Sequence, residues 1–207
     1  MALGPLPQFG LVMMAITIVL NSALSAQSLP TPESVLGFRP GADFHLATYE
    51  ESVDYFQRLD AASDRMMMME TGRTSEGRSW YIAVISTPEN LANLEQHKAT
   101  AARFADPASL TDEEARALAS TAKAIVDVNG GLHATEVAGA QHMIQLAYDL
   151  VTGEDRRTRE IRENVITVLW PSLNPDGQTM VAEWYHSNLG TPYEIASLPR
   201  LYQKYVG

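Results

Sequence analysis

The chain has 207 residues, of which 45% are hydrophobic and 19% charged, and its formal net charge at pH 7 is −10. This composition is typical of one globular domain with a sizeable core and not of a disordered chain. The acidic balance argues against binding to nucleic acid, which needs clustered lysine and arginine, and does not favour adhesion to anionic lipid. Because cysteine is absent, any metal site must use histidine, aspartate or glutamate, and thiol nucleophiles are excluded.

Residues 1–26 have the pattern of an export signal peptide. An uncharged apolar run from Gly10 to Leu20 is followed by small residues up to Ala26, and the run is too short to span a bilayer comfortably. Lysine and arginine are absent before Arg39, which departs from the usual signal pattern and leaves a short membrane anchor or a core helix as alternatives. We expect an exported protein, periplasmic or extracellular, without stable membrane association after signal removal.

The N-terminal third of the chain is expected to form a lead-in, a helix and a hairpin. Residues 27–47 carry three prolines and are predicted to be extended. Thr48 begins a capping-box sequence, TYEE, and the apolar residues after it recur at helical spacing. Strands are predicted at Met66 to Glu70 and Ser79 to Thr87, and the turn-rich segment between them predicts an antiparallel hairpin.

The rest of the chain alternates between helix and strand patterns. Helices are predicted from Pro88 to Phe104 and from Thr111, where TDEE is a second capping box, and again from Glu136 to Val151. Short apolar runs predict strands at Ala124 to Val128 and at Asn164 to Trp170. This order predicts an α/β fold, with a mixed, mostly parallel sheet, an N-terminal antiparallel hairpin and helices on both faces.

His133 and Glu136 are the candidate metal ligands. They lie three residues apart in the sequence GGLHATE, directly after the strand predicted at Ala124 to Val128. Imidazole and carboxylate are zinc ligand types, and the carboxyl end of a strand is where open α/β sheets bind ligands. The spacing alone is weak evidence. A solvated loop histidine and a glutamate stabilised by a helix N-terminus would give the same pattern.

Three motifs in this order resemble those of the M14 zinc carboxypeptidases: TGRTSEGRSW at Thr71 to Trp80, GGLHATE at Gly130 to Glu136, and NPDG at Asn174 to Gly177. The resemblance covers roughly Thr48 to Gly177. It implies an enzyme that hydrolyses C-terminal peptide bonds of a peptide or peptide-like substrate with zinc-activated water. It also implies that His133 and Glu136 bind Zn²⁺.

The same resemblance implies further site residues that have no match before Gly207: a third ligand histidine, an active-site tyrosine, a glutamate acting as general base and an asparagine–arginine pair. We therefore expect residues 48–207 to be the N-terminal part of a peptidase domain, inactive alone, with the general base beyond Gly207. The alternatives are a non-catalytic exported scaffold or peptide-binding remnant, and a related zinc deacylase.

The other histidines are weaker candidates for a third ligand. On a helix that starts near Glu136, His142 would point away from the helix start. His186 could fold back toward the site, whereas His45 and His97 are expected to be ordinary surface residues.

The remaining motif residues are predicted to be structural. Asn174 and Asp176 belong to a strong turn sequence, and Glu76 and Arg78 to the hairpin turn. The charges of alternating sign between Glu154 and Glu163 predict a solvated, internally paired helix face.

Overall fold

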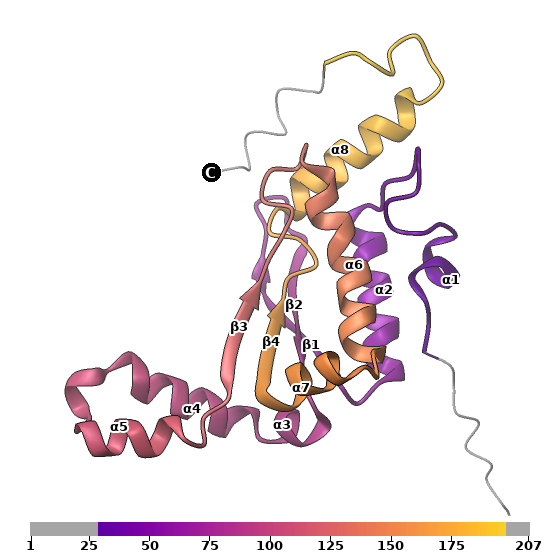
Figure 1. The fold of residues 1–207 in the computed structure, drawn as a ribbon. Coiled ribbons are helices and arrows are strands. Elements are labelled where there is room, and N and C mark those ends of the chain that lie inside the picture. The colour runs from indigo at the N-terminus through magenta and orange to yellow at the C-terminus, as the bar shows by residue number, and fades with distance from the viewer. Residues whose placement is uncertain (1–28, 198–207) are drawn as a thin grey trace, which may run out of the picture.

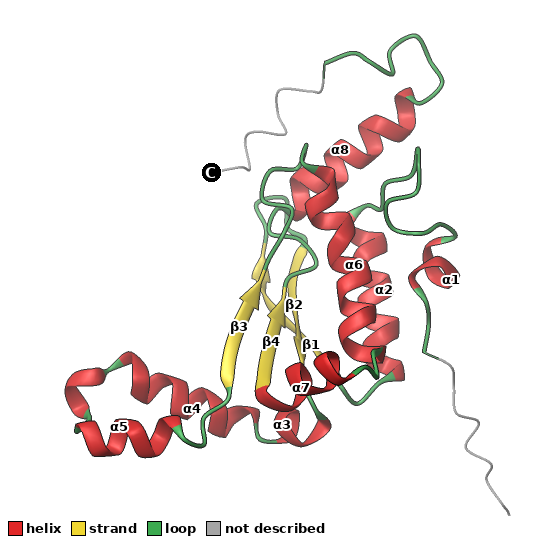
Figure 2. Ribbon diagram, in the orientation of Figure 1, coloured by secondary structure: helices red, strands yellow, loops and turns green. Residues whose placement is uncertain are grey.

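The computed structural model describes residues 29–197, so the expected signal segment at residues 1–26 and the final residues 198–207 lie outside it. Its centre is one sheet with helices packed along it (Figures 1 and 2). Four strands form this sheet, in the order β1 (Met66–Arg73), β2 (Ser79–Ile85), β4 (Val165–Leu169) and β3 (Ala124–Val128).

The sheet is mixed, as the sequence predicted. β1 pairs antiparallel with β2, which places Met68 opposite Ala83, and β2 pairs antiparallel with β4. β3 and β4 are parallel, with Val126 opposite Thr167. The expectation of a mostly parallel sheet is corrected for the described strands, where one pair of three is parallel, because β2 enters between β1 and β4 antiparallel to both.

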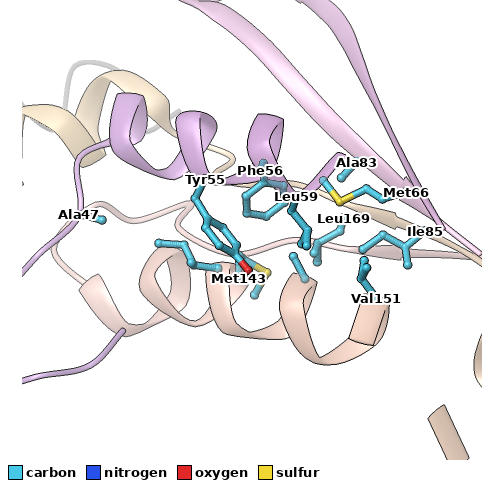
Figure 3. Close-up of a cluster of buried hydrophobic side chains, with 12 residues drawn as sticks. Ala47, Tyr55, Phe56, Leu59, Met66, Ala83, Ile85, Met143, Val151 and Leu169 are labelled. Carbon is cyan, nitrogen blue, oxygen red and sulfur yellow. The ribbon is translucent and has the colours of Figure 1, made fainter. Parts of the chain in front are cut away.

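The main core lies between the sheet and two long helices, α2 (Tyr49–Ala62) and α6 (Val137–Thr152), which cover one face (Figures 1 and 3). Apolar side chains from both helices meet those of β2 and β4 there. The largest fully buried members of this cluster are Tyr55, Phe56, Leu59, Ile85, Ile144, Val151 and Leu169. Burial of such side chains stabilises a fold by roughly 1.5–3 kcal/mol each, so this cluster is the main source of stability.

The second face has a smaller apolar cluster. Val84 and Ile166 point to this face because neighbouring residues of a strand alternate between faces, and they pack against Leu91 of α3 (Pro88–Ala92). Helices therefore contact both faces, as predicted, but the second is covered less. At the edge strand β3, Ile125 is 42% and Val126 43% exposed.

The helix α2 begins where the capping box predicted. The Thr48 hydroxyl accepts a hydrogen bond from the Glu51 amide, and the Glu51 carboxylate accepts one from the Thr48 amide. Tyr49 then joins α2 to the hairpin, because its hydroxyl donates to the Ser79 carbonyl (3.0 Å) and accepts from the Tyr81 amide (3.2 Å). Burial raises the pKa of Tyr49 to about 12, so this link stays neutral.

Two helical regions differ from the sequence prediction. The lead-in at residues 27–47, expected to be extended, contains α1 (Pro32–Leu36), because Thr31 caps its first turn and Pro32 starts it. The helix predicted from Pro88 to Phe104 is two helices, α3 and α4 (Leu94–Ala105), separated at Asn93.

A helical arm extends away from the sheet (Figure 1). It consists of α4, the short 3₁₀ turn η1 (Pro107–Ser109) and α5 (Asp112–Ala119), which starts at the predicted capping box of Thr111. Neither α4 nor α5 contains a buried residue. The arm is joined to the sheet at its start, where Leu94 of α4 packs against the second-face cluster, and α5 is stabilised locally by its capping box.

The last two helices are α7 (Arg156–Asn164) and α8 (Pro175–Asn188). α7 carries the alternating charges, which are mostly solvated and paired as predicted, for example Arg156 with Glu160, but Arg162 is an exception because it is only 4% exposed. Its guanidinium donates to the Leu150 carbonyl (2.8 Å) and so caps the end of α6. Among residues 29–197, none of the helices is both long and apolar enough to cross a membrane.

Candidate metal centre

The candidate site is the loop between β3 and α6. Gly131 sits in the left-handed region at φ +71°, which favours glycine. A side chain there would also be crowded, because a Cβ atom would lie 2.9 Å from both Ala140 Cβ and Ser172 Oγ. Glycine therefore lets the loop turn tightly between α6 and the segment after β4, which places His133 beyond the carboxyl end of β3.

The structure brings His133 and Glu136 together. His133 Nδ1 lies 3.2 Å from Glu136 Oε1, and the Glu136 amide donates to the His133 carbonyl at 2.9 Å. Their side chains are 53% and 75% exposed, so an ion could reach both from solvent. One imidazole nitrogen and one carboxylate on the same side of the loop fit two positions of a zinc site.

The other predicted histidines are not brought to this pair. His142 is exposed on α6 and His186 is exposed on α8, where its ring lies 6.0 Å from that of Tyr185. His45 Nδ1 is 2.8 Å from the Asp43 carbonyl oxygen. Among residues 29–197, no group of three or more histidine, aspartate or glutamate side chains is placed to hold a metal ion. The third ligand and the general base stay predictions.

Asn174 links the loop to α8. Its side-chain Nδ2 donates to the Leu132 carbonyl (3.2 Å), and its Oδ1 accepts from the Gly177 amide (3.0 Å) in the first turn of α8. The NPDG sequence was predicted to be a structural turn, and α8 itself was not predicted. An asparagine cap followed by proline at the first helical position was the signal that could have revealed this helix.

Asp176 links α8 to the hairpin. It is 4% exposed and accepts hydrogen bonds from the Thr74 hydroxyl (2.8 Å), the Glu76 amide (3.1 Å) and Arg78 Nη1 (2.8 Å). Arg78 also donates to Glu50 at 2.6 Å. Burial by itself would lower the pKa of Arg78, but the hydrogen bonds with Glu50 and Asp176 outweigh it and raise that pKa. The three motifs, far apart in sequence, thus form one network.

Two tryptophans lie at the same end of the sheet, and sequence reasoning gave them no role. Trp80 Nε1 donates to the Ser172 carbonyl (3.0 Å), and Trp170 Nε1 donates to Asp127 Oδ1 (2.7 Å). Their ring centroids are 5.1 Å apart, which is a favourable packing distance. Through these contacts the two tryptophans connect the start of β2 to the ends of β3 and β4, next to the loop.

A cleft of about 460 Å³ adjoins the candidate ligands. Thr135 and Val137, the neighbours of Glu136 in sequence, line one side, and Trp184 and Tyr185 of α8 line another. Phe44 also lines it, is 64% exposed and has an unusual positive φ of 66°. The site is therefore an open surface with an apolar cleft beside it.

Comparison with known proteins gives the family. The sequence profile described as zinc carboxypeptidase matches residues 52–193. A search of curated protein sequences returned no match. Two similar solved structures are thrombin-activatable fibrinolysis inhibitor (11% identity, 72% of this chain, 31% of that chain, TM-score 0.48) and carboxypeptidase A from Helicoverpa armigera (18%, 79%, 33%, 0.48). The chain thus spans about a third of the length of these structures. The profile match, over more than half of the residues, shows that the chain belongs to the zinc carboxypeptidase (M14) family.

Proposed function

We propose that this chain contributes two zinc ligands, His133 and Glu136, to a metallocarboxypeptidase that removes residues from the C-termini of peptides. The observation that carries the proposal is the 3.2 Å approach of His133 Nδ1 and Glu136 Oε1 at the carboxyl end of β3, in a chain of this family. The exposure of both side chains supports it, because a substrate needs access from solvent.

In this proposal His133 supplies an imidazole nitrogen and Glu136 a carboxylate. Zinc, when bound, acidifies water and polarises a peptide carbonyl. A catalytic zinc site needs three protein ligands, and the described residues bring two together. We therefore expect residues 29–197 to bind zinc weakly by themselves, and peptide hydrolysis to require a third ligand and a general base in addition.

We also propose that the protein is exported to the periplasm or the exterior and acts on peptides or peptide-like molecules there. The apolar run at Gly10 to Leu20, followed by small residues up to Ala26, supports this location. Recovery of the natural protein from an extracellular or periplasmic fraction, lacking about its first 26 residues, would support it, and recovery from the cytoplasm with Met1 retained would contradict it.

The test combines zinc content with product analysis. The purified natural protein is incubated with N-acylated dipeptides that end in apolar, acidic or basic residues, and released amino acids are quantified with and without a chelator. We expect release that the chelator abolishes and zinc restores. Substitution His133→Ala removes one ligand and should abolish zinc binding, whereas His142→Ala, an exposed histidine on α6, is the matched control.

The same experiment separates the proposal from its alternatives. Release of an acyl group in place of an amino acid would identify a zinc deacylase. Absence of bound zinc and of any product would leave a non-catalytic scaffold, and a His133→Ala variant that keeps its zinc would contradict the ligand assignment.

A further inference from the structure

Asn174 is buried, with an exposed fraction of 4%, although its side chain is a primary amide. A buried amide costs free energy unless its polar atoms have partners. The Asn174 amide has a partner on each side: Nδ2 donates to the Leu132 carbonyl and Oδ1 accepts from the Gly177 amide. One side chain thus joins the residue before His133 to the first turn of α8.

The space around Asn174 is tight. A Cβ atom at Gly177 would lie 2.5 Å from Asn174 Nδ2 and 2.8 Å from Ala134 Cβ, so glycine is required for this approach. Ala134, between the two candidate ligands, is itself only 5% exposed. The centre of the loop therefore packs onto the first turn of α8 at Gly177, while the side chains of His133 and Glu136 are exposed to solvent.

Both ends of this contact are anchored to the rest of the fold. The Leu173 amide donates to the Gly130 carbonyl at 2.9 Å, which fixes the start of the loop. Asp176 holds the first turn of α8 to the hairpin through Thr74 and Arg78. Asn174 therefore connects the loop to a part of the fold that is itself held by hydrogen bonds to the hairpin.

We propose that Asn174 is a positioning residue: by holding the Leu132 carbonyl, it keeps His133 and Glu136 in the relative arrangement that zinc binding needs. The inference rests on the proposed function, because Asn174 can position zinc ligands only if His133 and Glu136 bind zinc. A hydrogen-bonding partner that orients a ligand-bearing segment commonly changes metal affinity by 10- to 100-fold when it is removed.

The substitution Asn174→Asp separates the two hydrogen bonds. Aspartate keeps an oxygen for the Gly177 amide and is a good helix cap, but it has no N–H for the Leu132 carbonyl. Asn90→Asp is the matched control, because Asn90 is also buried and its Nδ2 donates to the Arg162 and Glu163 carbonyls at the opposite end of the sheet. Asn174→Ser, which also keeps a cap, replaces Asn174→Asp if the latter does not fold.

The first readout needs no metal. Amide hydrogen exchange at Glu136, whose N–H donates to the His133 carbonyl, is measured in the metal-free 207-residue chain. We expect Asn174→Asp to accelerate it about fivefold to tenfold, the worth of one hydrogen bond. Asn90→Asp should lower global stability without this local effect. Unchanged exchange in Asn174→Asp would overturn the proposal.

The second readout is a titration with Zn²⁺ alone, followed by the ring ¹⁵N shifts of His133, with His133→Ala as the assignment control. We expect about tenfold weaker affinity in Asn174→Asp and unchanged affinity in Asn90→Asp. A loosened loop with wild-type zinc affinity would overturn the positioning role. A wild-type chain whose His133 does not respond to zinc would contradict the proposed metal site. The exchange result alone would then show whether the Asn174–Leu132 hydrogen bond holds the loop.

Discussion

The two ends of the sheet each contain a buried asparagine that bonds to backbone carbonyls, yet the two ends differ in what they hold. At one end, Asn90 Nδ2 donates to Ser86 Oγ and to the Arg162 and Glu163 carbonyls, and the Ser86 hydroxyl donates to the Arg162 and Val165 carbonyls. The partners in this network are all buried or backbone groups, and the network joins the end of β2 to α3 and to the start of β4. Its role is structural.

At the other end, Asn174 holds a loop whose outer side presents His133 and Glu136 to solvent. The buried hydrogen bonds are of the same kind at both ends, so they do not reveal a site by themselves. The difference lies in the exposed side chains of the segment that they hold. A candidate site is therefore recognised when a rigid buried network supports metal-binding groups that remain accessible.

The largest effect is expected at the link between the hairpin and α8. Asp176→Ala would leave Arg78, whose side chain is 29% exposed, with one fewer carboxylate and would remove the acceptor of the Thr74 hydroxyl. Because the Thr74 hydroxyl, the Glu76 amide and Arg78 would each lose a buried carboxylate acceptor, we expect a loss of about 4 kcal/mol in the free energy of unfolding, measured by urea denaturation. Asp54→Ala removes an exposed pair with Arg58 and should cost below about 1 kcal/mol. Equal costs would contradict the buried network.

A smaller effect is expected from crowding at the site end. Gly131→Ala adds a strained left-handed residue and two contacts at 2.9 Å, for a cost of about 3 kcal/mol. Gly190→Ala is the control, because φ there is +72° and no atom lies within 4 Å of the added Cβ. It should cost about 1 kcal/mol by thermal or urea unfolding. If both variants lose the same stability, the tight packing of the loop is not supported.

The smallest effect is expected in the pH dependence of stability that comes from Glu50. Burial alone would raise the pKa of Glu50, but hydrogen bonds from Thr179 and Arg78 outweigh it and hold that pKa below its ordinary value of 4.5. Ionised Glu50 therefore adds stability above pH 4.5, and the contribution is lost as the pH falls through the lowered pKa. The stability difference between wild type and Glu50→Gln, below about 1 kcal/mol at pH 7, should shrink in acid. A difference independent of pH would contradict this assignment.

Local signals in the sequence predicted much of the fold. The capping boxes at Thr48 and Thr111 begin α2 and α5, and the apolar run Ala124 to Val128 is β3. These succeeded because the information is contained within a few neighbouring residues. The buried position of Arg162 could not be predicted, because its partner, the Leu150 carbonyl, belongs to another helix.

The candidate site was predicted in part for the same reason. His133 and Glu136 are three residues apart directly after a predicted strand, so one short loop can carry both, and the structure places His133 Nδ1 3.2 Å from Glu136 Oε1. Their role as zinc ligands stays a prediction. The hydrogen bond from Asn174 to the Leu132 carbonyl could not be predicted, because these two residues meet only through the packing of α8 against the loop. α8 itself was missed because the turn chemistry of Pro-Asp-Gly obscured a helix start.

The arm formed by α4, η1 and α5 gives the protein an experimental handle. Neither α4 nor α5 contains a buried residue, and neither does the η1 turn between them. Exposed connections of this kind commonly accept inserted sequence without loss of the fold. An affinity tag or a fluorophore placed in the η1 turn, Pro107–Ser109, would project away from the sheet (Figure 1). The protein could then be immobilised or followed by fluorescence while the loop carrying His133 stays exposed to solvent.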